Sequence, residues 1–236
     1  HGIVASSVGG ATPAFTNTLS TTFDGVDDYV TMGNPTSLQI TGALSISAWV
    51  KINSTNGDCI LSKDDVTNRS HQLWAINPND SFPKFVIFSS NIAYAVSGIT
   101  DLNDNQWHHV AAVFTPSTSL KIYIDGTLEG TNTTSIPSSI DNEPANFEIG
   151  RFGFGNYQLN GNIDEVSIFN TELSQTNITD IYNLGTPTDI SAISGLVSWW
   201  RMGDGSTYPT INDAAGSNNG TMTNMSSANF VTDVPT

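Results

Sequence analysis

The sequence predicts an all-β protein, folded as an antiparallel β-sandwich with one short helix. Runs with a two-residue apolar period recur along the 236 residues, and turn-forming residues separate them. Hydrophobic residues make up 38% of the chain and charged residues only 12%. The remainder is rich in Ser, Thr, Asn and Gly, which suits short strands joined by many turns. We expect one large sandwich, because all-β domains often use this length as a single unit.

Eight runs are predicted to be strands. They span residues 28–32, 44–52, 72–76, 84–89, 107–114, 120–124, 146–150 and 162–169. In the second run, Ile46, Ala48 and Val50 share one face, while polar residues and Trp49 lie on the other. Such a sheet packs on one side and is partly hydrated on the other. Two sheets of this kind, placed face to face, form a sandwich.

The turns between the runs predict antiparallel pairing. Thr-Pro-Ser-Thr-Ser separates the run 107–114 from the run 120–124, and Asp125-Gly126 then turns the chain again. We therefore expect a meander over this part of the chain.

One stretch, 174–184, has helical periodicity. Ile178 and Ile181 fall on one face, and either Ser174 or Thr176 can cap the start, with a glycine following the end. We expect this short helix to cover one end of the sandwich.

The charge balance excludes some classes of partner. Seven Lys and Arg oppose 22 Asp and Glu, which gives a formal net charge of -15. Nucleic acid and anionic membranes are therefore repelled at long range. The chain has no apolar run near the ~18 residues of a spanning helix, so no membrane insertion is expected. The one cysteine, Cys59, is interpreted as a small, partly buried apolar residue.

Several segments resemble the laminin-G-like domains of the concanavalin-A-like lectin/glucanase superfamily. They are Phe-Asp-Gly-Val-Asp-Asp-Tyr-Val (23–30), Ile-Ser-Ala-Trp-Val (46–50), Trp-His-His-Val-Ala (107–111), Ile-Tyr-Ile-Asp-Gly (122–126) and Gly-Asn-Ile-Asp-Glu-Val (161–166). The resemblance implies a jelly-roll sandwich. It also implies a binding or adhesion module of the kind attached to enzymes, cell-surface proteins and phage structural proteins.

The C-terminal segment resembles the leader that normally precedes the Phe-Asp-Gly strand in this family. Gly-Leu-Val-Ser-Trp-Trp-Arg-Met-Gly-Asp-Gly (195–205) carries this resemblance, yet it follows the core. We predict a circular permutation, with residues 195–236 supplying strands to the same sandwich. The alternatives are the leader of a second, truncated repeat and a segment exchanged with a neighbouring subunit.

The sequence does not predict an enzyme. Retaining glycosidases need two carboxyl groups about 5 Å apart on one face, and no Glu-x-Asp-x-Glu pattern is present. Asp164 and Glu165 are adjacent, so a regular strand sends their side chains to opposite faces. For the same reason His108 and His109 are not expected to bind one metal ion.

Calcium is the one cofactor predicted, in a structural role. Asp24 and Asp164 are the candidate ligands, because the resemblance implies that their two strands are neighbours and that such acids hold calcium with main-chain oxygens. The alternative is that Asp24 caps a turn and Asp164 accepts hydrogen bonds without a metal.

Exposed aromatic side chains are the usual platforms for sugar rings, and four residues are candidate ligand contacts. Phe154 lies between two glycines, which suggests a projecting loop, and Trp74 lies next to a loop. Arg69 and His71 precede the same strand as Trp74. The alternatives are that the aromatic residues belong to the core and that His71 merely completes a turn.

Two functions fit these observations. The first is a non-catalytic surface module that binds a glycan or a surface protein. The second is a structural virion decoration or appendage protein, or an adhesin repeat, whose main contacts are with itself or a capsid. Both imply an extracellular, cell-surface or virion-surface location. The chain begins at His1 without Met, so we expect a processed product or an excised fragment.

Overall fold

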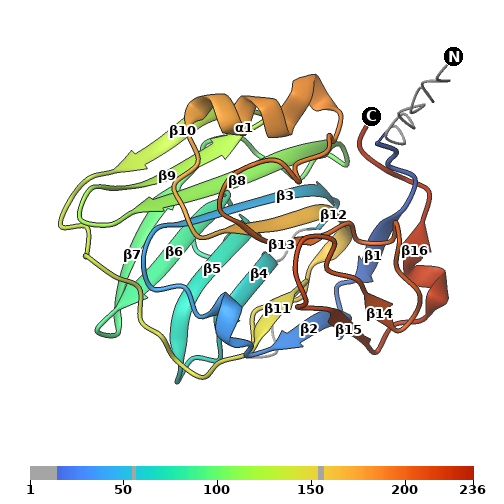
Figure 1. Ribbon diagram of the computed structural model, residues 1–236, viewed down its shortest axis with the longest axis horizontal. Coiled ribbons are helices and arrows are strands. Elements are labelled where there is room, and N and C mark those ends of the chain that lie inside the picture. The colour runs from blue at the N-terminus through green and yellow to red at the C-terminus, as the bar shows by residue number, and fades with distance from the viewer. Residues whose placement is uncertain (1–14, 55–56, 154–156) are drawn as a thin grey trace, which may run out of the picture.

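The structure, a computed structural model, describes residues 15–54, 57–153 and 157–236. Two antiparallel sheets face each other and form a β-sandwich with one short α-helix (Figure 1), as the sequence predicts. Three short 3-10 turns, Thr36–Leu38, Asn183–Gly185 and Ser227–Asn229, lie between the regular elements.

The first sheet has eight strands in the order β10-β9-β8-β3-β12-β1-β16, and β13 also pairs with β12. Their bounds are β1 Ser20–Asp24, β3 Leu44–Ile52, β8 Trp107–Thr115, β9 Ser119–Ile124, β10 Thr127–Asn132, β12 Asn160–Phe169, β13 Leu196–Trp200 and β16 Phe230–Val231.

The second sheet also has eight strands, in the order β14-β15-β2-β11-β4-β5-β6-β7. Their bounds are β2 Tyr29–Gly33, β4 Asp58–Asp64, β5 Arg69–Ile76, β6 Lys84–Ser89, β7 Ile92–Ser97, β11 Phe147–Ile149, β14 Thr210–Ile211 and β15 Gly220–Thr223.

The main hydrophobic core lies between the two sheets. Ile46, Ala48 and Val50 contribute to it from β3, as their alternation predicts, and Leu73 and Phe85 face them from the second sheet. The residues between these positions point outward, so each sheet also presents an outer face.

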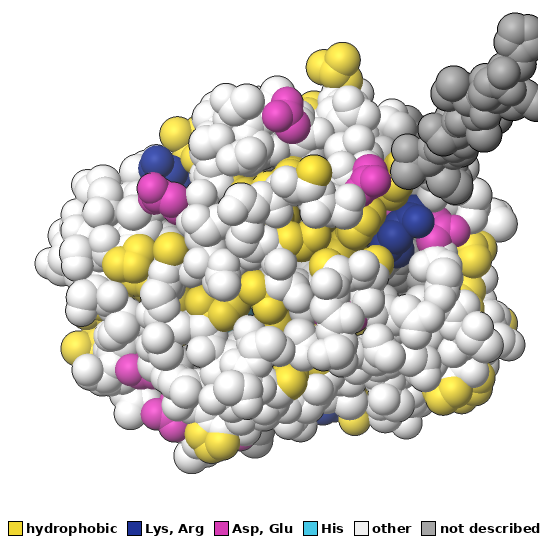
Figure 2. Space-filling model, viewed as in Figure 1, with side chains coloured by type: hydrophobic (Ala, Val, Ile, Leu, Met, Phe, Trp, Pro, Cys, Tyr) yellow, Lys and Arg dark blue, Asp and Glu magenta, His cyan; other side chains and the backbone are white. Residues whose placement is uncertain are grey.

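Helix α1, Gln175–Tyr182, packs on the outer face of the first sheet rather than over one end of the sandwich. Ser174 caps its start, accepting from the Asn177 backbone N–H. Ile178 and Ile181 bury against outward side chains of β8, β12 and β13. The outer face of this sheet is apolar, and the helix buries it from water. This explains why the helix lies on the sheet and not at one end of the sandwich, as we expected. Figure 2 shows hydrophobic side chains gathered below the helix on this side.

The C-terminal strands enter both sheets. β13 pairs with β12 and β16 with β1 in the first sheet, while β15 pairs with β2 in the second. Trp200 points into the main core, whereas Trp199 packs with the residues under α1. The two tryptophans therefore face opposite sides of one strand, as their adjacency predicts.

Candidate functional site

A groove with a volume of about 340 Å³ lies on the outer face of the second sheet, over β5, β6 and β7. We call it the aromatic groove. Its lining includes Gln72, Trp74, Asn77, Phe88, Phe152 and Tyr157.

The strand alternation places these side chains. Leu73 and Phe85 enter the core, so Gln72 and Trp74 on β5 and Phe88 on β6 must point outward. Phe152 and Tyr157 reach the same face from the segment that follows β11.

The aromatic rings form one cluster. The centroid of Trp74 lies 5.6 Å from that of Phe152 and 5.6 Å from that of Tyr157. The Arg69 guanidinium lies 3.9 Å from the centroid of the Phe88 ring. Such contacts hold the rings in fixed orientations before any ligand arrives.

A hydrogen-bond chain fixes the polar edge of the groove. Trp74 Nε1 donates to Gln72 Oε1 over 2.8 Å, and Gln72 Nε2 donates to Asp64 Oδ2 over 2.6 Å. Arg69 Nε donates to the same Asp64 oxygen over 3.0 Å. The Asp64 carboxylate is fully buried and the Arg69 side chain is 31% exposed, so the Asp64–Gln72–Trp74 part of this network is shielded from water.

The charges in the groove are balanced. Arg69 pairs with Asp64 and Lys84 with Asp80. The other polar groups are the Gln72, Asn77 and Asn79 amides and the Tyr157 hydroxyl. Neutral hydrogen-bonding groups next to aromatic rings suit an uncharged, hydroxyl-rich ligand.

The four predicted ligand contacts have different outcomes. Trp74 and Arg69 both line the aromatic groove, but the Trp74 side chain is only 3% exposed and packs in a buried cluster with Phe88 and Phe152. Phe154 lies outside the described residues, although Phe152 and Tyr157 on either side of it line the groove.

His71 does not reach the groove, which corrects its interpretation as a ligand contact. Its side chain is buried on the core side of β5, with a ring centroid 5.8 Å from that of Phe147. Burial, and then the nearby Lys63 charge, lower the pKa of His71 to about 3. The imidazole is therefore neutral at ordinary pH and packs as a core residue.

The structure does not bring Asp24 and Asp164 together. The partner of Asp24 on β12 is Asn160, four residues before Asp164, which separates the two by roughly 13 Å along the strands. Asp164 is buried and accepts from Asn17 Nδ2 and from the Glu165 backbone N–H, each over 2.8 Å. Burial, and then the Glu165 charge, raise the pKa of Asp164 well above its usual value.

A different group of acids gathers around Asp24. Asp24, Asp27 and Asp28 each place a carboxylate oxygen within 4.8 Å of the others. Asp24 Oδ1 also accepts from the backbone N–H groups of Val26 and Asp27, so it shapes the turn as well. Burial, and then the Asp24 charge, raise the pKa of Asp28. Three hard oxygen ligands on one turn could hold a divalent cation.

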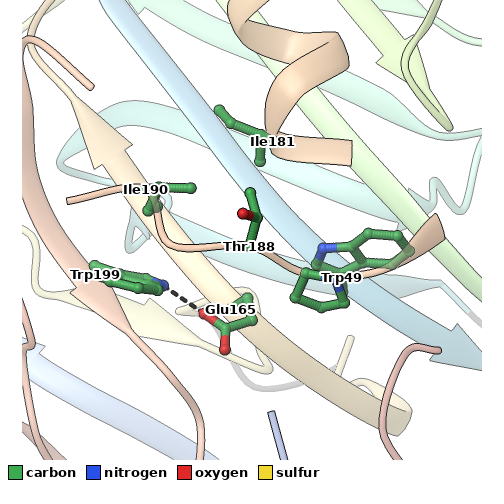
Figure 3. Close-up of a pocket in the computed structure, with 7 residues that line it drawn as sticks. Trp49, Glu165, Ile181, Thr188, Ile190 and Trp199 are labelled. Carbon is green, nitrogen blue, oxygen red and sulfur yellow. Dashed lines mark hydrogen bonds between the residues drawn. The ribbon is translucent and has the colours of Figure 1, made fainter. Parts of the chain in front are cut away.

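The expectation that the Glu165 side chain lies on the opposite face of the strand from Asp164 is wrong. A bulge in β12 between Asp164 and Ser167, with a φ of 48° at Glu165, breaks the alternation. Figure 3 shows Glu165 between Trp49 and Trp199, beside the segment that carries Thr188. Its carboxylate accepts from Trp199 Nε1 over 2.5 Å and pairs with Arg201.

The cavity beside Glu165 measures about 10 Å³, which is room for one water at most. A sugar cannot reach the carboxylate in this arrangement. Glu165 is therefore a buried structural acid of the described chain and not an accessible general acid.

Sequence reasoning missed Gln72, Asn77 and Phe88 as groove residues. The signal was present for two of them, because Gln72 shares a face with Trp74 on one run, and Phe88 is outward on the next. Nothing in the local pattern indicates that Asn77, in the loop after β5, turns back toward that face.

The profile of the Concanavalin A-like lectin/glucanases superfamily matches residues 24–179. This match covers more than half of the chain, which therefore belongs to that superfamily. A comparison with curated proteins found no match.

Solved structures share the fold at low sequence identity. A candidate carbohydrate-binding protein from Bacteroides ovatus ATCC 8483 superposes with a TM-score of 0.70 at 20% identity, covering 94% of this chain. The chain spans 62% of that protein's length. Domain 4 of the extracellular arabinanase AbnA from Geobacillus stearothermophilus, solved with arabinotriose, superposes with a TM-score of 0.52 at 22% identity. That match covers 69% of this chain and 76% of the AbnA domain.

A heptameric SAP-like pentraxin from Limulus polyphemus is similar as well, with a TM-score of 0.53 at 14% identity. That match covers 70% of this chain and 82% of the pentraxin. In the described chain, no helix is long and apolar enough to cross a membrane.

Proposed function

We propose that this chain is a non-catalytic module that binds a neutral glycan in the aromatic groove. The observation that carries the proposal is the part-exposed Tyr157 ring, which packs on the buried Trp74 and Phe152 rings beside amide side chains and paired charges in one groove. Aromatic rings stack on the apolar faces of sugars, and amides bond their hydroxyls.

The comparisons support the proposal at the level of the fold. One similar structure is a candidate carbohydrate-binding protein, and another was solved with arabinotriose. Both are under 25% identical to this chain, so the ligand class rests on the groove itself.

Two features of the acids favour binding over hydrolysis. Asp64, which borders the groove, is engaged by Arg69 and Gln72. Glu165 is enclosed beside a cavity too small for a sugar. A glycosidase needs two carboxyl groups that both reach the scissile bond.

We also propose calcium as the cation that the Asp24–Asp27–Asp28 turn would hold, in a structural role. The turn supplies three carboxylates, a donor set suited to this hard cation. The proposal includes an extracellular, cell-surface or virion-surface location.

Affinity electrophoresis in gels that contain neutral polysaccharides tests the binding function. Arabinan, xylan, mannan and mixed-linkage β-glucan are the probes, and at least one should retard the protein. Tyr157→Ala should weaken that retardation by roughly 5- to 100-fold in affinity, if the loss of a stacking ring costs about 1–3 kcal/mol, as it does where nucleobases stack on aromatic side chains.

Tyr208→Ala is the matched control, since Tyr208 is also part-exposed but is not in the groove. It should leave retardation unchanged. A protein that no polysaccharide retards and that forms a stable oligomer in light scattering would instead favour the structural, self-assembling alternative.

A further inference from the structure

A second hollow adjoins the aromatic groove on the same face of the second sheet. It measures about 170 Å³ and is lined by Asp64, Asp65, Asn146, Glu148, Arg151 and Gly153. We call it the polar hollow, because none of the described residues that line it is aromatic.

The two depressions share one floor. Val86 pairs with Gln72, Gln72 with Ser62, and Ser62 with Glu148, so these four residues form a row across β6, β5, β4 and β11. Three strand spacings separate the ends of the row, which is roughly 14 Å at about 4.8 Å each. That span exceeds one sugar ring.

The Asp64 side chain contributes to both depressions. It lines the polar hollow, and its carboxylate also orients Arg69 and Gln72 in the aromatic groove. The chain itself crosses the boundary between Phe152, in the groove, and Gly153, in the hollow.

Gly153 leaves no room for a side chain at this boundary. A Cβ there would lie 2.3 Å from the Asp64 carbonyl oxygen and 3.4 Å from Glu148 Oε2. Glycine therefore lets the backbone at residue 153 lie directly against the Asp64 carbonyl oxygen of β4.

The polar hollow offers rigid hydrogen-bonding groups. Arg151 holds Glu148 with two bonds of 2.7 Å each, and its guanidinium lies 3.3 Å from the centroid of the Tyr29 ring. The exposed Asn146 side chain makes no hydrogen bond with any residue that the structure describes, so its amide is available to a ligand.

We infer that the aromatic groove and the polar hollow form one binding surface for a neutral glycan chain of at least two sugar units. One unit stacks on Tyr157, the part-exposed ring of the aromatic groove. The next bonds the Asn146 amide in the polar hollow. This inference rests on the proposed function and adds the length of the ligand and the second contact region.

An array of neutral oligosaccharides of one to six units, cut from arabinan, xylan, mannan and β-glucan, tests the inference on the full chain. In at least one series, the affinity should rise by 10-fold or more between one unit and three. If the single sugar binds as tightly as the longer chains, the inference is wrong while the proposed function stands. If no series binds, the proposed function fails and the inference with it.

Two variants separate the regions in the series that binds. Asn146→Ala should lower the affinity for the trisaccharide by roughly 2- to 10-fold and leave the single sugar unchanged, because one neutral hydrogen bond is lost. Tyr157→Ala should weaken every length.

Asn142→Ala, in the same loop but outside the polar hollow, is the matched control and should change nothing. Equal losses for all lengths in Asn146→Ala, or no loss for any, would overturn the assignment of the polar hollow.

Discussion

Val66, in the turn between β4 and β5, has a backbone conformation that a β-branched residue rarely adopts. Its φ is 72° and its side chain is 44% exposed. Asp64 Oδ1 accepts from its backbone N–H over 2.7 Å and holds the turn in place. The same carboxylate orients Arg69 and Gln72 at the groove. Asp64 therefore stabilises both the strained turn and the candidate site.

Val66→Gly is expected to raise the free energy of unfolding by up to about 1 kcal/mol. Relief of the left-handed strain, about 1–2 kcal/mol, outweighs the added flexibility of the unfolded chain. Chemical denaturation measures the change. Val26→Gly is the control: Val26 is exposed without a positive φ, so that variant should lose stability. A loss of the same size in both variants would show that Val66 is not strained.

Glu165 makes the stability depend on pH. Burial raises its pKa to about 7, against the opposing effects of the Arg201 charge and the Trp199 and Arg201 hydrogen bonds. A raised carboxyl pKa means that the folded state binds the proton more tightly than the unfolded state. The stabilising contribution is complete below about 4.5 and disappears as pH rises through about 7.

Glu165→Gln should therefore remove a contribution that falls with pH, so its melting temperature should fall less, or rise more, than that of the wild type between pH 4.5 and pH 7.5. His71 and His109 oppose the Glu165 contribution in both proteins, because burial lowers their pKa values to about 3 and about 4, and each destabilises the fold on acidification. The measurement is the melting temperature of wild type and variant at both pH values. The exposed Glu172→Gln is the control. A constant offset between Glu165→Gln and wild type at both pH values would contradict the titration.

At the scale of elements, alternation predicted the strands that have one apolar face. The runs 44–52 and 84–89 match β3 and β6 residue for residue. Strand β4 was missed, because it is buried along its whole length and bulges near Cys59 and Leu61 interrupt its register. The same kind of irregularity in β12 made the expected orientation of Glu165 wrong.

The candidate site was predictable only in part. Trp74 and Arg69 were identified from residue type and their place beside a loop. The polar hollow was not, because Asp64, Glu148 and Asn146 come together through pairing of β4 with β11, which are far apart in the sequence. Pairing of this kind depends on the whole fold and leaves no local sequence pattern.

The Asp24–Asp28 turn carries the calcium prediction. If calcium binds there, a saturating concentration of 100 times the dissociation constant should add about 2.7 kcal/mol to the free energy of unfolding. Asp27→Asn should abolish the shift in melting temperature, since Asp27 is exposed and belongs to the acidic group. Asp180→Asn, an exposed position on α1, should retain it. An unchanged wild-type melting curve with calcium and with chelator would contradict calcium binding.

At the scale of the whole molecule, the C-terminal strands pair with strands of both sheets. Trp200, Met202, Ile211 and Met222 all enter the main core. Burial of these side chains contributes several kcal/mol, taking about 25 cal/mol per Å² as an upper estimate. The circular permutation itself stays a prediction, as does the description of the chain as one domain.

Deleting the residues after Gly185 should give an aggregating or unfolded product, because it uncovers β12 and an apolar sheet edge. Trp200→Ala is a milder test and should lower the free energy of unfolding by about 3–5 kcal/mol. Light scattering and denaturation measure the two outcomes. A truncated chain that stays monomeric and equally stable would show that the segment is dispensable to the sandwich.

We propose that the outer face of the second sheet binds glycan. The decisive test is a crystal structure of the protein with the oligosaccharide that binds most tightly in the array. We predict sugar density in the aromatic groove, with one ring against Tyr157 and the next unit within hydrogen-bonding distance of Asn146. Sugar density confined to another surface, such as the Asp24–Asp28 turn or the face covered by α1, would contradict it.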